Sequence, residues 1–187
     1  MFSFTQKVAV SPLVKSKGKN NCKYIVLHHT GTKNYKGELN VLSGKNYNPN
    51  SPASCHFLVW PKWETAKIGE PTDILRHVWV SARGNEWKIN NSLNRCCLGI
   101  EITWPLDDGW FTTEQKVIVK KLVEHLMAVY SIPQDRILRH CDLTHKWSIK
   151  KEYWKIWTVG RKWDVAHTFF PRWDFLAWRA SLIPLSQ

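Results

Sequence analysis

Two histidines lie at the ends of apolar segments, where a strand can fix a side chain that reaches into a cleft. His28 lies in KYIVLHH (residues 23–29), and His140 ends RILRH (residues 136–140). Glu101 lies inside the apolar segment LGIEI. Burying a carboxylate there costs free energy unless it is paired with another polar group or takes part in catalysis. Taken alone, each histidine is more often structural, and Glu101 is equally compatible with a buried salt bridge. Together they fit zinc-dependent hydrolysis, in which three protein ligands hold the metal and a carboxylate outside the metal shell acts as general base.

A second polar sequence, GRKWD at residues 160–164, places a cation two residues before a carboxylate. On its own this pattern is typical of a solvated loop. Considered together with the histidines, the same pattern offers two groups that could serve a zinc-dependent hydrolase. Asp164 is of a type that completes a zinc shell, and Lys162 is of a type that stabilises a developing oxyanion.

The elements that must hold these residues are predicted to be strands alternating with helices. Residues 33–52 are rich in Asn, Gly, Lys, Pro and Ser and are expected to form a loop. Strands are expected at residues 23–29, 55–60, 74–80, 97–103 and 136–140, with 97–103 central. Such an alternation indicates an α/β fold with a single mixed central β-sheet flanked by helices.

Residues 113–130 carry the clearest helix signal. Thr112 and Gln115 have the spacing of a capping box at its start. Apolar residues then recur at three- and four-residue spacing, which predicts an amphipathic helix; they are Ile118, Leu122, Leu126 and Val129. A closing helix is expected at residues 172–183.

Length and composition predict one globular domain with a basic surface. The 187 residues carry a net charge of +12 and include 12 tryptophans. Residues 1–21 are expected to form a basic, partly mobile arm, and residues 22–187 a single domain. The charge favours polyanionic surroundings, but no nucleic-acid recognition motif is present. The five cysteines, odd in number, are expected to be reduced and packed as small apolar residues.

The same residues define a resemblance that spans roughly residues 23–175. The sequence resembles the zinc-dependent N-acetylmuramoyl-L-alanine amidases of type 2, a family that includes phage lysozyme-like amidases, anhydromuropeptide amidases and peptidoglycan recognition proteins. Six segments follow the family's motifs in order: IVLHHTGT (25–32), SCHFLVW (54–60), HVWVS (77–81), NRCCLGIEI (94–102), IPQDRILRHCDL (132–143) and GRKWD (160–164). The resemblance implies the fold of the peptidoglycan recognition proteins.

The resemblance also implies a role for each candidate residue. Zn²⁺ would be held by His28, His140 and Asp164, with Glu101 as general base and Lys162 on the oxyanion. The bond cleaved would be the amide between N-acetylmuramic acid and L-alanine of the stem peptide. Four further residues are candidates for substrate binding or for a supporting role: His29, His56, His77 and Asn94.

Three departures from the family pattern bear on these roles. The family's Asp-Pro-Gly reads Asp164-Val165-Ala166 here, which leaves His167 as an alternative third ligand. A Trp- and Lys-rich insertion at about residues 145–158 separates the second and third expected ligands. It is expected either to pack its tryptophans on the domain or to form a rim that stacks on sugars or an anionic envelope. Cys55 replaces a tyrosine of phage-type and animal enzymes, which favours Glu101 as the base.

The expected function is therefore that of a phage or prophage endolysin, a monomeric single-domain enzyme that degrades peptidoglycan. Alternatives are a cytoplasmic recycling amidase acting on soluble anhydromuropeptides, a recognition module without catalysis, and a virion-associated lysin. No apolar run approaches the roughly 18 residues of a membrane-spanning helix, and the N-terminus lacks the features of a secretory signal. Synthesis in the host cytoplasm, followed by release onto the wall, is therefore expected.

Overall fold

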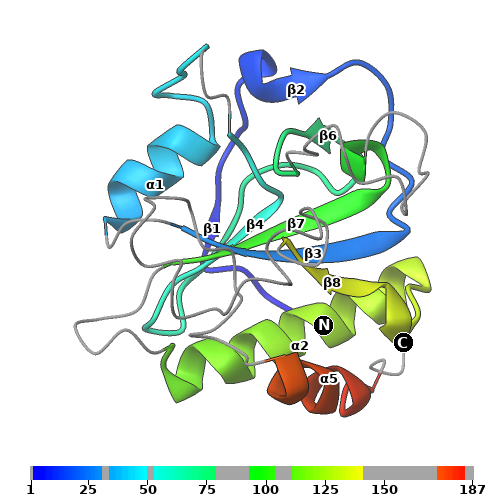
Figure 1. Ribbon diagram of the computed structural model, residues 1–187. Coiled ribbons are helices and arrows are strands. Elements are labelled where there is room, and N and C mark those ends of the chain that lie inside the picture. Colours follow the sequence, from blue (N-terminus) through cyan, green and yellow to red (C-terminus); the bar gives the residue numbers. More distant parts are fainter. Residues whose placement is uncertain are drawn as a thin grey trace, which may run out of the picture.

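A six-stranded mixed sheet forms the centre of the computed structural model, which describes residues 2–30, 34–49, 53–78, 93–103, 111–140 and 172–183 (Figure 1). Its order is β1 (Gln6–Lys7), β5 (Thr65–Lys67), β4 (Phe57–Val59), β7 (Cys97–Ile102), β3 (Tyr24–His29) and β8 (Ile137–Arg139). Within this six-stranded sheet, the described β4–β5 pair is antiparallel and the other four described pairs are parallel. The predicted fold, one mixed sheet flanked by helices, is confirmed.

Helix α2 (Thr113–Tyr130) covers one face of this sheet, and α5 (Arg172–Ala180) lies beside it (Figure 1). Alternate residues of the two central strands point to this side because successive strand side chains face opposite ways. Ile25, Leu27 and Ile100 are fully buried there with the apolar face of α2. The predicted helix 113–130 and its capping box are both confirmed: Thr112 Oγ1 accepts from Gln115 N, and Gln115 Oε1 from Thr112 N.

The opposite face carries α1 (Tyr35–Leu42) and a small two-stranded sheet of β2 (Lys15–Ser16) and β6 (Ile74–Leu75) (Figure 1). Here the prediction of a loop over 33–52 is wrong for residues 35–42. The Asn34 side chain caps the helix by accepting from Gly37 N. Leu42 belongs to one buried cluster with Leu58 of the sheet, and Leu39 packs against that cluster. Tertiary packing thus stabilises a helix whose local sequence resembles a loop.

Residues 2–21 pack against the sheet. Gln6 of β1 pairs in parallel with Ala66 of β5, and Lys15 of β2 pairs with Leu75 of β6. Phe4 stacks on Phe57 with ring centroids 5.3 Å apart. Between the two strands lies a short 3-10 helix, η1 (Pro12–Val14). The N-terminal segment therefore completes one edge of the main sheet and half of the small one.

The remaining expectations are met in part. The strand expected at 74–80 is limited to Ile74–Leu75 within the described residues. Two further 3-10 turns, η2 (Leu93–Arg95) and η3 (Gln134–Arg136), precede β7 and β8. The insertion at 145–158 lies outside the described residues. No helix in the described part of the chain is long and apolar enough to cross a membrane.

Candidate active site

Three adjacent parallel strands bring His28, Glu101 and His140 together at their carboxyl ends. His28 of β3 is in register with Glu101 of β7. Leu27 is in register with Arg139 of β8, so the next residue, His140, lies beside His28. The His28 and His140 rings are 4.6 Å apart between centroids. Parallel strands end at the same edge of a sheet, which explains why residues so distant in sequence meet here.

His77 adds a third imidazole to this cluster. His77 Nδ1 lies 3.0 Å from His28 Nε2, and His77 Nε2 donates to the carbonyl of Cys97 over 3.2 Å. The His77 ring lies directly over Gly99 of β7, where an added Cβ would come within 2.6 Å of His77 Cγ. A side chain at residue 99 would therefore displace His77.

Asn94 fixes the backbone at His77. Its Oδ1 accepts from the backbone N–H groups of His77 and Val78, at 3.1 and 2.9 Å. Its Nδ2 donates to the carbonyl of Val78 over 3.1 Å. Backbone partners thus take both acceptor positions and one of the two donor positions of the Asn94 side chain. These contacts hold the backbone at His77 and Val78 in place.

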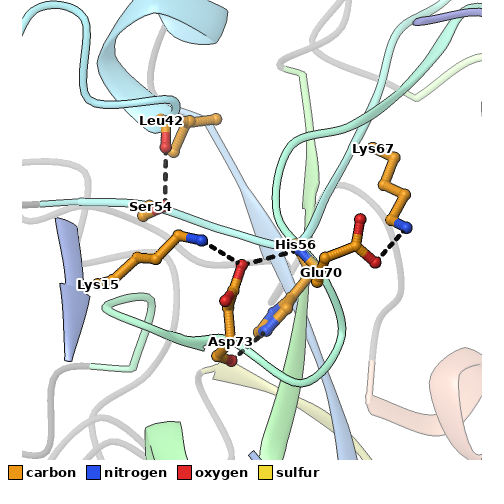
Figure 2. Close-up of polar contacts among 7 residues, drawn as sticks. All are labelled: Lys15, Leu42, Ser54, His56, Lys67, Glu70 and Asp73. Atoms are coloured by element: carbon orange, nitrogen blue, oxygen red, sulfur yellow. Dashed lines mark hydrogen bonds and ion pairs between the residues drawn. The ribbon is translucent and has the colours of Figure 1, made fainter. Parts of the chain in front are cut away.

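His56 supports the same strand from β4's side. Its Nδ1 accepts from the backbone N–H of Gly99, and its Nε2 donates to the carbonyl of Asp73, both over 3.0 Å. The Asp73 carboxylate in turn accepts from the backbone N–H of Glu70 and pairs with Lys15 at 2.8 Å (Figure 2). Both ring nitrogens of His56 therefore have hydrogen-bond partners within the protein.

Burial favours the neutral form of His28, His77 and His56. Burial is the main cause that lowers the pKa of His28 well below its usual 6.5, and the neighbouring His140, His77 and His29 lower it further. Burial likewise lowers the pKa of His77, and that of His56 to about 4. Neutral imidazole is the form that binds metal ions. The electrostatic environment therefore suits a metal site.

His29 and Cys55 lie close to the cluster but contact other groups. His29 points to the other face of β3, where its Nδ1 contacts the Thr30 carbonyl and its ring lies 6.5 Å from Phe111. Burial, followed by the charge of Glu101, raises the pKa of the Cys55 thiol well above its usual value. The Cys55 thiol donates to the carbonyl of Phe57 over 3.2 Å. Cys55 therefore remains a packed neutral thiol. The other described cysteines are likewise free and buried.

A metal at this site would find two of its expected ligands in the described residues. His28 and His140 present neighbouring imidazoles, a donor type that zinc prefers. The expected third ligand Asp164, its alternative His167 and the expected oxyanion partner Lys162 lie outside the described residues. Within the described residues, no group of three or more His, Cys, Asp or Glu side chains is arranged to hold a metal. The two imidazoles in the described residues, those of His28 and His140, are ligands of a type that fits zinc.

The sequence alone did not reveal the contact between His28 and His77. The only signal for it is Gly99, a glycine in an otherwise apolar strand, which often marks a close approach by another group. The partner in that approach follows only from the three-dimensional structure.

The fold is thus a mixed α/β sheet that gathers two histidines and a glutamate at the carboxyl ends of three adjacent parallel strands. Residues 18–166 match the family model of N-acetylmuramoyl-L-alanine amidase. The chain belongs to this family. No curated protein matches the chain by similarity.

Solved structures share the fold at low sequence identity. A mutant endolysin from Bacillus subtilis is 22% identical with a TM-score of 0.62, covering 97% of this chain and 99% of the other. The catalytic domain of XlyA is 21% identical with a TM-score of 0.62, over 97% and 99% of the two chains. An AmpD derivative is 17% identical with a TM-score of 0.63, over 97% and 96%. At these identities the likeness shows the fold.

Proposed function

We propose that this chain is a zinc-dependent peptidoglycan hydrolase that cleaves the amide between N-acetylmuramic acid and L-alanine. The observation that carries the proposal is the meeting of His28, Glu101 and His140 at the ends of three adjacent strands. Family membership supplies the reaction class. We assign His28, His140 and Asp164 as the metal ligands, with His167 as the alternative to Asp164.

When bound, zinc would supply Lewis acidity, which lowers the pKa of a water and polarises a carbonyl. Glu101 stands beside His28 on β7 and is half-buried, so its carboxylate can take the proton of the attacking water. As the C–N bond breaks, Glu101 returns that proton to the leaving amine of L-alanine. Lys162 would stabilise the oxyanion that forms on the former carbonyl oxygen.

The biological role we propose is that of a phage or prophage endolysin. Support comes from structural neighbours described as endolysins, such as those from Clostridium intestinale and Bacillus subtilis. The net charge of +12 suits attraction to an anionic wall or envelope. The likeness to an AmpD derivative keeps a second candidate open, in which the same chemistry acts on soluble muropeptides. Activity on intact sacculi compared with soluble anhydromuropeptides separates the two roles.

The first test measures metal content and peptidoglycan cleavage on one preparation, with and without a chelator. We expect about one zinc per chain and release of peptides with free N-terminal alanine that stops when the metal is removed. A metal-free chain that releases nothing but still sediments with sacculi would instead identify a recognition module on an amidase scaffold.

A further inference from the structure

We propose that His77 is a positioning residue for His28: it accepts a hydrogen bond from His28 Nε2, holds the proton on that nitrogen, and so makes Nδ1 the atom with which His28 binds metal. The second half of this statement rests on the proposed function, in which His28 is a ligand. The first half concerns only where a proton resides, and it holds with or without metal.

The argument begins at the Cys97 carbonyl, because a carbonyl oxygen can only accept. His77 Nε2 lies 3.2 Å from that oxygen and must therefore carry a proton. A neutral imidazole carries one proton, so His77 Nδ1 is an acceptor. The nitrogen facing it, His28 Nε2 at 3.0 Å, must then be the donor. Neutral His28 consequently has its lone pair on Nδ1.

The His77 ring is held in place, so it cannot easily rotate to exchange its donor Nε2 and its acceptor Nδ1. Its backbone N–H and that of Val78 are both held by Asn94 Oδ1. Its ring lies against Gly99 and is only 4% exposed. The strand beneath it is held by His56, whose Nδ1 accepts from Gly99 N and whose Nε2 donates to Asp73 O. Asp73 is itself fixed by Lys15 and by the Glu70 backbone (Figure 2).

This arrangement has the form of an outer hydrogen bond that orients a metal-binding histidine. In metal sites generally, the second nitrogen of a ligating imidazole donates to an acceptor that fixes its tautomer and ring orientation. That acceptor is commonly a carboxylate or a carbonyl. Here the acceptor is the imidazole of His77. The Cys97 carbonyl fixes the tautomer of His77 by accepting a hydrogen bond from its Nε2.

The decisive experiment is imidazole ¹⁵N NMR of the full-length, metal-free protein at neutral pH. We expect His28, His77 and His56 each to show a protonated Nε2 and an unprotonated Nδ1. A His28 with its proton on Nδ1 in this spectrum overturns the proposal, whatever the protein's activity. This NMR measurement requires neither a variant nor bound zinc.

Two substitutions then test the link to metal binding. His77→Asn keeps an acceptor oxygen near the position of Nδ1, whereas His77→Ala removes it. We expect zinc affinity, measured by competition with a chelator, to fall about 10–100-fold in His77→Ala and to recover largely in His77→Asn. The His28 signal should lose its single tautomer in His77→Ala and regain it in His77→Asn. His125→Asn, at a half-buried histidine of α2 whose ring stacks on Phe2, is the matched control and should bind zinc as the wild type does.

The outcomes separate the two proposals. If the wild type binds zinc and His77→Ala binds it equally well, His77 has no positioning role and this inference is wrong. If the wild type shows the expected tautomers but binds no zinc, the hydrogen-bond assignment stands and the zinc-dependent function fails.

Discussion

At the scale of single residues, Glu101 is the group whose role can be tested most directly. It adjoins His28 in the sheet register, yet we place it outside the set of metal ligands. We expect Glu101→Gln to keep its full zinc content and to lose activity by about 10²–10⁴-fold, the usual contribution of a general base. Metal analysis and peptide release on the same sample check this. Near-normal turnover in zinc-loaded Glu101→Gln would remove the residue from the mechanism.

His140 is expected to behave in the opposite way. As a proposed ligand, it couples metal binding to folding, because zinc stabilises only the state that binds it. We expect His140→Ala to lose most bound zinc and, with it, the rise in melting temperature that zinc gives the wild type. Melting curves with zinc and with chelator show the effect as a loss of the difference between them. A preserved difference would exclude His140 as a ligand.

At the scale of elements, β7 is constrained by the ring that lies across it. Gly99→Ala would place a Cβ 2.6 Å from His77 Cγ and 2.7 Å from His77 Nδ1. We expect a loss of about 1–3 kcal/mol in the free energy of unfolding, typical of overpacking, together with weaker zinc binding. Urea unfolding and chelator competition measure the two effects. Gly99→Ala combined with His77→Ala should recover part of the lost stability, because the clash is then absent.

Helix α2 depends on its capping box and on a link to the sheet. Thr112 and Gln115 cap each other reciprocally, and Gln115 Nε2 also donates to the carbonyl of Thr103 just beyond β7. We expect Thr112→Ala to lower the free energy of unfolding by about 1 kcal/mol. Val117→Ala, at an exposed position of the same helix, should cost clearly less. Equal losses in urea unfolding would show that the cap contributes nothing beyond helix propensity.

At the scale of the whole molecule, the buried histidines make stability depend on pH. In the unfolded chain they bind protons near pH 6.5, whereas in the folded protein burial lowers the pKa of His28 and His77, and that of His56 to about 4. Below pH 6.5 the unfolded state therefore binds more protons, so stability falls as the pH falls.

For His56 this loss extends from about pH 6.5 to pH 4 and amounts to roughly 3 kcal/mol. Urea unfolding of the metal-free protein at several pH values across this range measures it. His56→Gln, which does not titrate, should be less stable at neutral pH but show a flatter pH dependence. An equally steep dependence in His56→Gln would assign the effect to other groups.

The sequence by itself determined the elements whose signals are local. The periodicity and capping box of α2, the apolar runs of β3 and β7, and the placement of His28, Glu101 and His140 at strand ends were all readable from neighbouring residues. They were readable because burial imposes a regular pattern on side chains within one element. The ordered motifs also identified the family that the match over residues 18–166 shows.

Only the tertiary structure decided what depends on contacts between distant segments. Helix α1 forms in a stretch of loop-like composition because Leu39 and Leu42 pack on the sheet. The N-terminal strands exist because β5 and β6 offer them edges to pair with. The hydrogen bond from His28 to His77 joins residues 49 positions apart across Gly99, and no local pattern encodes it. Such contacts arise from packing, which fixes the partner of each side chain only once the chain has folded.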